Sequence, residues 1–184
     1  TNLEVMNQIL HYKTSSTSDN YQILKDNLQV GKLYKAEWLG NPIDTVLNEH
    51  KYRFISKGIF KPTISVLDIS SNSIVGTVRF QNLLSFYQSA VLTLSNGTEY
   101  RWKSNKLFAY DWQWSDLNTE EIILSSTEPF DAFKQNGTII LNDKTHDKEL
   151  FISLGIHLRN VAKRKSLLPR VMGIIILLTL LSRL

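Results

Sequence analysis

The sequence contains no cysteine among its 184 residues. Disulfide bonds, cysteine-ligated zinc, thiolate-held iron–sulfur clusters and thiol nucleophiles are therefore excluded, and a reducing compartment fits. Catalytic signatures are equally scarce: there is no Gly-x-Ser-x-Gly elbow, no phosphate-binding glycine loop and no His-Glu-x-x-His pair. The carboxylates are scattered through expected turns, so no acid–base pair stands out. The sequence favours a non-enzymatic protein and indicates no cofactor and no metal.

Positive charge is in slight excess, with a formal net charge of +4, but it is unevenly placed. Five cations lie in one short segment near the C-terminus: Arg159, Lys163, Arg164, Lys165 and Arg170. No helix-turn-helix, zinc-finger or RNP-like pattern surrounds them, which argues against nucleic acid as a partner. A basic segment beside an apolar run suits anionic lipid, because each cation near the surface contributes about 1 kcal/mol. The alternative is a solvated helix end, where cations are also favoured.

Most of the chain has the period of two that is typical of antiparallel strands. The pattern extends from about Lys32 to Asn142 and is clearest over residues 98–103, where threonine and two aromatic residues alternate with charged residues. Further strands are predicted at residues 52–55, 64–69, 74–80, 90–94, 121–124 and 138–141. Ser-Asn-Ser at 71–73 and Asn-Gly at 96–97 and 136–137 predict turns between strands. The absence of alternating helical segments argues against a parallel sheet.

The N-terminal part has a different pattern. Apolar residues over 3–10 have helical spacing, and the polar tract over 14–20 predicts a loop. We therefore divide the chain into an N-terminal helix and polar loop (1–31), a β domain with a central helix (32–162) and a basic-apolar tail (163–184). The first residues lack the basic and apolar pattern of a secretory signal, so we expect a cytoplasmic location or the cytoplasmic side of a membrane.

One segment near the C-terminus is apolar on every helical face. It extends from Leu150 to Leu158, with Asp147 and Glu149 at its start and cations at its end, as the helix dipole favours. Such a helix must be surrounded by a barrel, by other helices or by lipid. The expected fold class is mainly β (α+β): an antiparallel β-barrel or strongly curved sheet around this hydrophobic C-terminal helix. Leu154 and Ile156 should then be nearly inaccessible to solvent.

A second apolar run, Val171 to Leu181, carries no charge. As a helix it would reach only about 16 Å, against about 30 Å for the hydrocarbon core of a bilayer. Counted from Leu167 to Leu184 the reach is about 27 Å, provided that the terminal arginines extend toward the headgroups. The run could be a tail anchor, an element of the core or a dimerisation segment. As an anchor it would place the β domain on the cytoplasmic side, because basic residues precede it.

An aromatic stripe is the best local candidate for a ligand surface. Tyr110, Trp112 and Trp114 share one face of a predicted strand. Aromatic residues pack well across strands, so a buried stripe is the default interpretation. If the face were exposed, it could bind an apolar or sugar-like ligand, or lie at a membrane interface.

The order of these elements resembles the tubby-like superfamily, which includes the tubby C-terminal domain, the phospholipid scramblases and the plant LURP-one-related proteins. The matching parts are two strand–turn–strand units (Ile64–Phe80 and Ala90–Lys103), the strand around Tyr110–Ser115 and the helix Leu150–Leu158. In that family a closed antiparallel barrel surrounds a hydrophobic helix near the C-terminus. The resemblance implies this fold and a general membrane association. It gives no site residues, because neither the phosphoinositide-binding residues of tubby proteins nor the calcium-binding segment of scramblases is found here.

Two functions follow as expectations. The first is a non-enzymatic, membrane-proximal binding or scaffolding module that contacts anionic lipid through Lys163, Arg164, Lys165 and Arg170, with an oligomer through residues 167–184 as a further option. The alternative is a soluble carrier or enzyme that binds an apolar ligand beside the Trp112/Trp114 stripe. A filled barrel would favour the first, and an open cavity bordered by the two rings would favour the second.

Overall fold

Twelve antiparallel strands close into a single barrel in a computed structural model of the chain. The structure describes residues 8–14, 20–35, 42–58, 63–81, 89–104, 111–128, 136–142 and 146–163. The strands are β1 (Gln8–Thr14), β2 (Tyr21–Lys25), β3 (Leu28–Lys35), β4 (Ile43–Leu47), β5 (His50–Lys57), β6 (Thr63–Asp68), β7 (Ser73–Phe80), β8 (Ser89–Leu94), β9 (Glu99–Ser104), β10 (Trp112–Asp116), β11 (Ile122–Thr127) and β12 (Asn136–Leu141).

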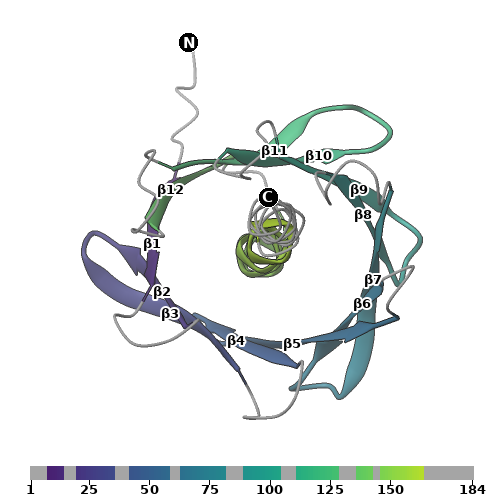
Figure 1. Ribbon diagram of the computed structural model, residues 1–184, viewed down its shortest axis with the longest axis horizontal. Helices are drawn as coiled ribbons and strands as arrows, with labels where there is room; N and C mark the ends of the chain where they lie inside the picture. The colour runs from purple at the N-terminus through teal and green to yellow at the C-terminus, as the bar shows by residue number, and fades with distance from the viewer. Residues whose placement is uncertain are drawn as a thin grey trace, which may run out of the picture.

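Each strand pairs with its neighbours in sequence, and β1 closes the ring by pairing with β12. After β12 the chain forms a helix, described over residues 148–163, which runs through the middle of the ring (Figure 1). Short turns join β2 to β3, β4 to β5, β6 to β7, β8 to β9 and β10 to β11 at one end of the barrel, and the helix begins there. We call this the turn end. We call the opposite end, where the odd-numbered strands end and residue 163 lies, the exit end.

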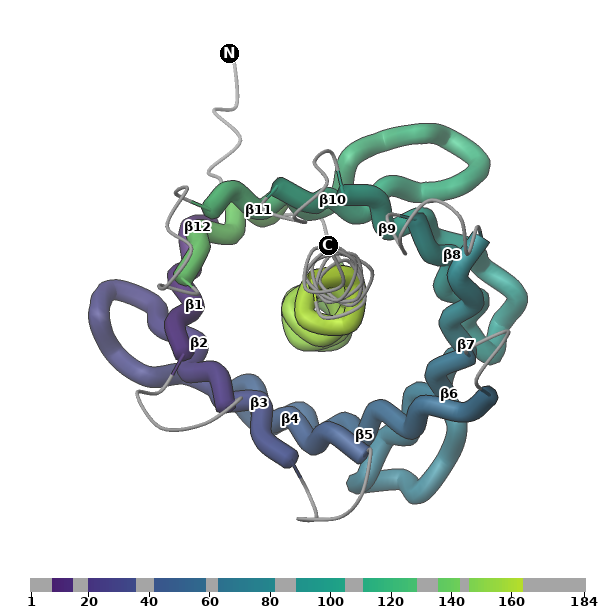
Figure 2. Tube along the Cα trace, viewed as in Figure 1, coloured from purple at the N-terminus to yellow at the C-terminus, as the bar shows by residue number. Residues whose placement is uncertain are grey.

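The predicted fold class is confirmed: a mainly β protein whose closed antiparallel barrel surrounds a C-terminal helix. The Cα trace shows the helix enclosed by strands on every side when viewed along the barrel axis (Figure 2). Every residue from Leu150 to Leu158 is buried, and the exposed fractions of Leu154 and Ile156 are both 0%. The helix can be apolar on all faces because every face meets the inner wall of the barrel.

The wall follows the period of two that the sequence predicts. In β6, for example, Ile64 and Val66 are buried, whereas Thr63, Ser65 and Leu67 are half-buried. The predicted turns at 71–73 and 96–97 are confirmed, with positive φ angles of 52° at Asn72 and 86° at Gly97. The Asp68 carboxylate adds hydrogen bonds from the Ser70 and Ser71 backbone N–H groups, at 2.8 and 3.4 Å.

Two expectations about the chain were wrong. The helix expected over residues 3–10 is contradicted at residues 8–10, which belong to β1, where Leu10 is buried and Ile9 is exposed. A short apolar run fits the period of a helix as well as that of a strand. Here the segment forms a strand because it pairs with β2 and β12. The barrel therefore begins at Gln8 rather than at residue 32.

The turn expected at Asn136–Gly137 was also wrong, because both residues begin β12. Gly137 is needed there for space rather than for a turn. A Cβ atom at Gly137 would lie 2.6 Å from the ring of Tyr12, its register partner on β1. The glycine thus lets the Tyr12 ring lie across the neighbouring strand.

Close approach of the helix to the wall depends on Gly155. A Cβ atom at this position would lie 2.3 and 2.4 Å from two ring carbons of Trp112 and 3.0 Å from Nε1 of Trp114. The Trp114 indole N–H in turn donates to the Phe151 carbonyl at 3.0 Å. Helix and wall are therefore in direct contact along the two tryptophans.

Replacement of this glycine should destabilise the barrel. Gly155→Ala would normally favour a helix, but here the added methyl group meets rigid, fully buried rings, and we expect a net loss of about 1–3 kcal/mol in the free energy of unfolding. Urea titration followed by far-UV circular dichroism measures this loss. Val161→Ala, at a half-buried position of the same helix, serves as the control and should change the value by less. Equal effects of the two substitutions would contradict the close contact.

Candidate functional site

The structure separates the residues that the sequence singled out. Trp112 and Trp114 are buried in the barrel interior, with exposed fractions of 1% and 0%. Lys163 is the last described residue of the helix and is half-buried at the exit end. The other candidates, Tyr110, Arg164, Lys165 and Arg170, lie outside the described residues, as does nearly all of the predicted tail. No helix within the described residues has the length and apolar character needed to cross a membrane.

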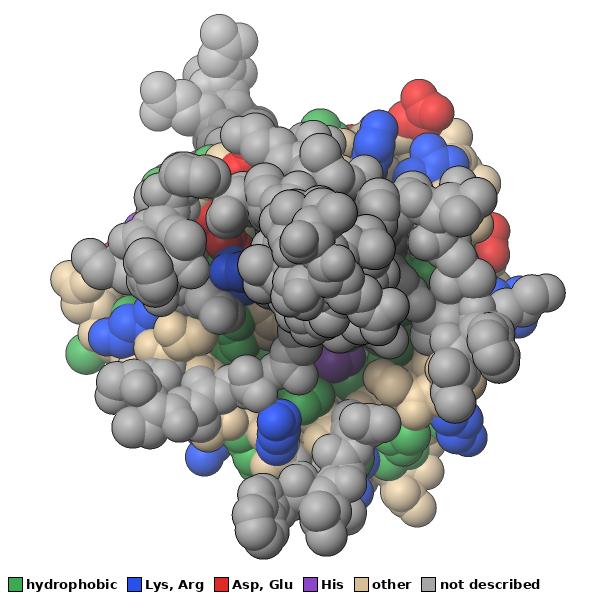
Figure 3. Space-filling view, viewed as in Figure 1, with side chains coloured by type: hydrophobic (Ala, Val, Ile, Leu, Met, Phe, Trp, Pro, Cys, Tyr) green, Lys and Arg blue, Asp and Glu red, His purple; other side chains and the backbone are tan. Residues whose placement is uncertain are grey.

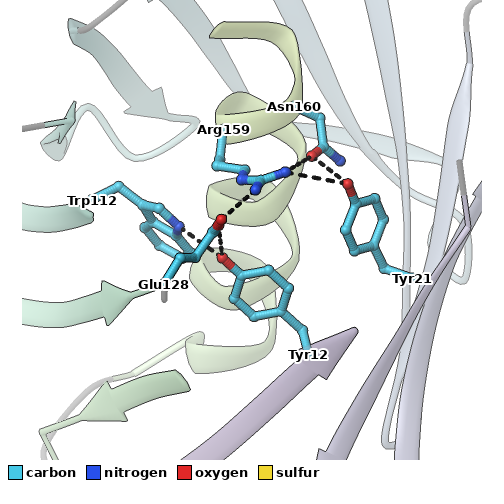
Figure 4. A network of polar contacts seen from close by, with 6 residues as sticks. All are labelled: Tyr12, Tyr21, Trp112, Glu128, Arg159 and Asn160. Atoms are coloured by element: carbon cyan, nitrogen blue, oxygen red, sulfur yellow. Dashed lines mark hydrogen bonds and ion pairs between the residues drawn. The ribbon is translucent and has the colours of Figure 1, made fainter. Parts of the chain in front are cut away.

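A buried polar network lies where the helix approaches the exit end (Figure 4). At its centre Arg159 of the helix forms an ion pair with Glu128, which directly follows β11. The exposed fractions of these two side chains are 0% and 1%. Tyr12 of β1 donates its hydroxyl hydrogen to the other carboxylate oxygen of Glu128, and Trp112 donates its indole N–H to the Tyr12 hydroxyl at 3.4 Å.

A second branch of the network reaches the opposite side of the helix. Arg159 Nη1 donates to Oδ1 of Asn160 at 3.0 Å and to the hydroxyl of Tyr21, on β2, at 3.4 Å. The Tyr21 hydroxyl also donates to Asn160 Oδ1, at 2.7 Å. We call Tyr12, Tyr21, Trp112, Glu128, Arg159 and Asn160 the exit network. It connects β1, β2, β10 and the end of β11 to one turn of the helix.

Burial and the ion pair act in opposite directions on the pKa values of the two charged partners in the exit network. Burial raises the pKa of Glu128, although the Arg159 guanidinium acts in the opposite direction. For Arg159 burial alone would lower the pKa, but the Glu128 carboxylate outweighs it and the net pKa lies above the usual value. The pKa of Tyr12 is raised by burial and by the Glu128 charge, so its hydroxyl keeps its proton. The pKa of Lys163 is lowered, because burial and the nearby Arg159 charge both disfavour its charged form.

The contacts of the exit network hold the helix against the barrel wall. Tyr12 remains a hydrogen-bond donor, and the Glu128 carboxylate is engaged by both Tyr12 and Arg159. The members of the network fix the helix to the wall, as a buried ion pair does when both of its partners are held by further hydrogen bonds.

Other polar contacts secure the rest of the helix. Near the turn end the Asn48 side-chain amide donates to Glu149 at 2.9 Å. In the interior the Thr45 hydroxyl of β4 donates to the Ser153 hydroxyl at 3.0 Å. Further along, the ring of His157 stacks on Phe54, with centroids 5.3 Å apart. Each polar residue that interrupts the apolar helix therefore has a contact on the wall.

The sequence reasoning missed the exit network. It counted Arg159 as part of the basic cluster and did not consider Tyr12, Tyr21 or Glu128. The signal that could have revealed the network is an arginine within one turn of an apolar helix that must be enclosed. Such an arginine requires a carboxylate on the wall. The identity of that carboxylate could not be read from the sequence, because 31 residues separate Glu128 from Arg159.

Removal of one member of the ion pair should cost much more than removal of both. Glu128→Leu leaves the Arg159 guanidinium buried without its carboxylate, and we expect a loss of about 3–5 kcal/mol in the free energy of unfolding. In the double variant Glu128→Leu/Arg159→Met, neither charge remains to be desolvated, so the loss should be clearly smaller. Denaturant unfolding of the wild type, both single variants and the double variant forms a complete double-mutant cycle. Additive losses would show that the pair is not coupled.

The raised pKa of Glu128 also predicts a pH dependence. A carboxyl group whose folded-state pKa is raised binds its proton more readily in the folded state, so it adds stability as the pH falls from the raised value toward its usual range. The stability of the wild type relative to Glu128→Gln should therefore increase on acidification through this window. Urea unfolding of both proteins from pH 7.5 to pH 4 measures the difference. A relative decrease would mean that Arg159 outweighs burial and holds the carboxyl group ionised.

Comparison with known proteins yields a likeness of fold. No family model and no curated protein matches the sequence. Among solved structures, an X-ray structure of a protein from Arabidopsis thaliana superimposes with a TM-score of 0.59 and 11% sequence identity. The alignment covers 84% of this chain and 91% of the plant protein. At this level of identity the likeness establishes a shared fold alone.

Proposed function

We propose that this protein is a tubby-like, non-enzymatic module that binds or scaffolds at a membrane surface, and that residues 163–184 make the contact with anionic lipid. One observation carries the proposal: the helix runs through the barrel, and its last described residue, Lys163, lies at one rim. The basic residues Lys163, Arg164 and Lys165 and the apolar run from Val171 follow directly in sequence from that point. A basic segment next to an apolar run has the composition that anionic bilayers attract.

The filled interior supports a binding module over a carrier. The alternative function needs open space beside Trp112 and Trp114. Instead, the Trp112 ring lies so close to Gly155 that a methyl group would not fit, and the edge of the Trp114 ring packs against Phe151, with centroids 5.4 Å apart. The two tryptophans thus support the helix rather than line a ligand site.

The likeness to the plant protein supports the same proposal at the level of architecture. Its fold agrees with the layout that links this sequence to the tubby-like superfamily, in which a barrel surrounds a hydrophobic helix. The exit network adds a reason why the helix would stay in place while the tail acts. Arg159 and Asn160 connect the last turns of the helix to β1, β2 and the end of β11.

Vesicle co-sedimentation tests the proposal. The full chain should bind vesicles of phosphatidylcholine with phosphatidylserine and bind less to phosphatidylcholine alone, and a chain that ends at Ser166 should lose most of the binding. Arg164→Gln/Lys165→Gln should weaken it by about 2 kcal/mol, or roughly 1 kcal/mol per cation. The matched control, Lys25→Gln/Lys51→Gln, removes two exposed cations at the turn end.

The outcomes separate the alternatives for the tail. If the full chain and the chain ending at Ser166 both stay in the supernatant and unfold at the same temperature, the membrane function is wrong. If truncation lowers the unfolding temperature without changing vesicle binding, the apolar run belongs to the core of the domain. Vesicle binding that depends on the tail, with equal unfolding temperatures, supports the membrane contact.

A further inference from the structure

Cations recur at the exit end of the barrel. Each odd-numbered strand from β1 to β9 carries one at its last or penultimate position: Lys13, Lys35, Lys57, Arg79 and Lys103. All five side chains are exposed. Because these strands all end on the same side of the barrel, the five cations form part of a ring, which we call the exit rim. Figure 3 looks onto this end and shows Lys and Arg side chains at separate points around its outline.

The turn end has the opposite character. Exposed acidic residues lie in its turns and at the start of the helix: Asp26, Glu49, Glu120, Glu121 and Asp147. The turn end also carries the exposed cations Lys25 and Lys51, but the exposed acidic residues outnumber them, so the net charge of the described side chains differs between the two ends of the barrel. A molecule with this distribution orients in the field of a charged surface, with its positive end toward negative charge.

The register of the wall fixes the spacing of the exit rim. Lys57 pairs with Thr63, and Thr63 pairs with Arg79, so the two cations lie in one row two strands apart, a separation of about 9.5 Å between their backbones. Among the described residues, Lys13, Lys57, Arg79 and Lys103 form no ion pair. The like charges therefore repel one another, and an anionic partner would relieve the repulsion.

Among the described residues, little unpaired negative charge balances the exit rim. The described carboxylates at this end are Glu128, which Arg159 engages, Asp44, which Arg53 engages, and Asp111. The half-buried Lys163 adds a further cation inside the ring, where the helix reaches the same end. In the sequence, Lys163 is followed directly by two further cations, Arg164 and Lys165.

We propose that the exit rim is a membrane-facing surface, on which the barrel stands end-on against the anionic headgroups of a bilayer with its turn end directed away. The inference rests on the proposed function and adds a second contact, made by the barrel wall itself. A flat surface can meet all members of a ring at once, whereas a linear polyanion meets a stripe or groove. The shape of the charge distribution therefore favours a bilayer.

Charge variants of the full chain test the surface. Lys57→Gln/Arg79→Gln removes two cations of the exit rim, and Lys25→Gln/Lys51→Gln removes two exposed cations at the turn end, so the change in net charge is the same. On vesicles with phosphatidylserine, the rim variant should lose about fivefold in partition coefficient per cation, whereas the control should change less than twofold. Equal effects of the two variants would overturn the proposal.

Site-specific labels test the orientation. Since the chain has no cysteine, single cysteines can be introduced at Thr127, which ends β11 at the exit end, and at Asn118, in a turn at the opposite end; both positions are exposed. With a fluorophore at each position and quencher-labelled headgroups, vesicle binding should quench the label at 127 and leave the label at 118 nearly unchanged.

The results distinguish the two proposals. If the wild type binds anionic vesicles but the label at 118 is quenched as strongly as the label at 127, the end-on surface is wrong while the membrane function stands. If the wild type binds no vesicles, the proposed function fails and the exit rim fails with it. Selective quenching at 127, together with the selective loss in the rim variant, supports the end-on contact.

Discussion

The fit between one apolar helix and the inner wall of the barrel is the constraint on which the rest of the structure depends. The diameter of a barrel grows with its number of strands, and side chains of the wall alone fill the interior of small barrels. A ring of twelve strands encloses more space than that. The helix supplies the missing core, and its distance from the wall is set where Gly155 meets Trp112. Because helix and wall are each other's core, neither can be understood as an independent unit. This explains why polar residues on the helix, such as Ser153, have hydrogen-bonding partners on the strands.

The same constraint accounts for the polar ends of the helix. Its first turn needs partners at the turn end, where Asn48 reaches Glu149, and its last turns need partners at the exit end, where Glu128 reaches Arg159. A buried ion pair gives little net stability compared with apolar residues, but it disfavours any other position of the helix. A shift along the axis would leave a charge in the apolar interior without its partner. We therefore interpret the exit network as the feature that fixes the depth of the helix within the barrel.

The sequence predicted the enclosure because its pattern requires it: a helix apolar on all faces after many half-buried strands. It did not predict β4, whose central residues look polar. Asp44 is buried by its bidentate pairing with Arg53, at 2.7 and 2.8 Å, and Thr45 is buried by its contact with the helix. These partners come from other elements, so no local pattern reveals them. The exit network was missed for the same reason, since its members are brought together only by closure of the ring.

The charged exit rim escaped the sequence analysis because its cations are dispersed. Lys13, Lys35, Lys57 and Arg79 follow one another at intervals of 22 residues along the chain, so none of them lies in a basic cluster. In a meander, two consecutive strands and their connections return the chain to the same end of the barrel. Residues separated by that length therefore lie at the same end, two strands apart. The interval of 22 residues here is the length of one such return. Closure of the barrel thus converts a dispersed set of cations into a surface, and a count of local clusters cannot detect a surface that is made in this way.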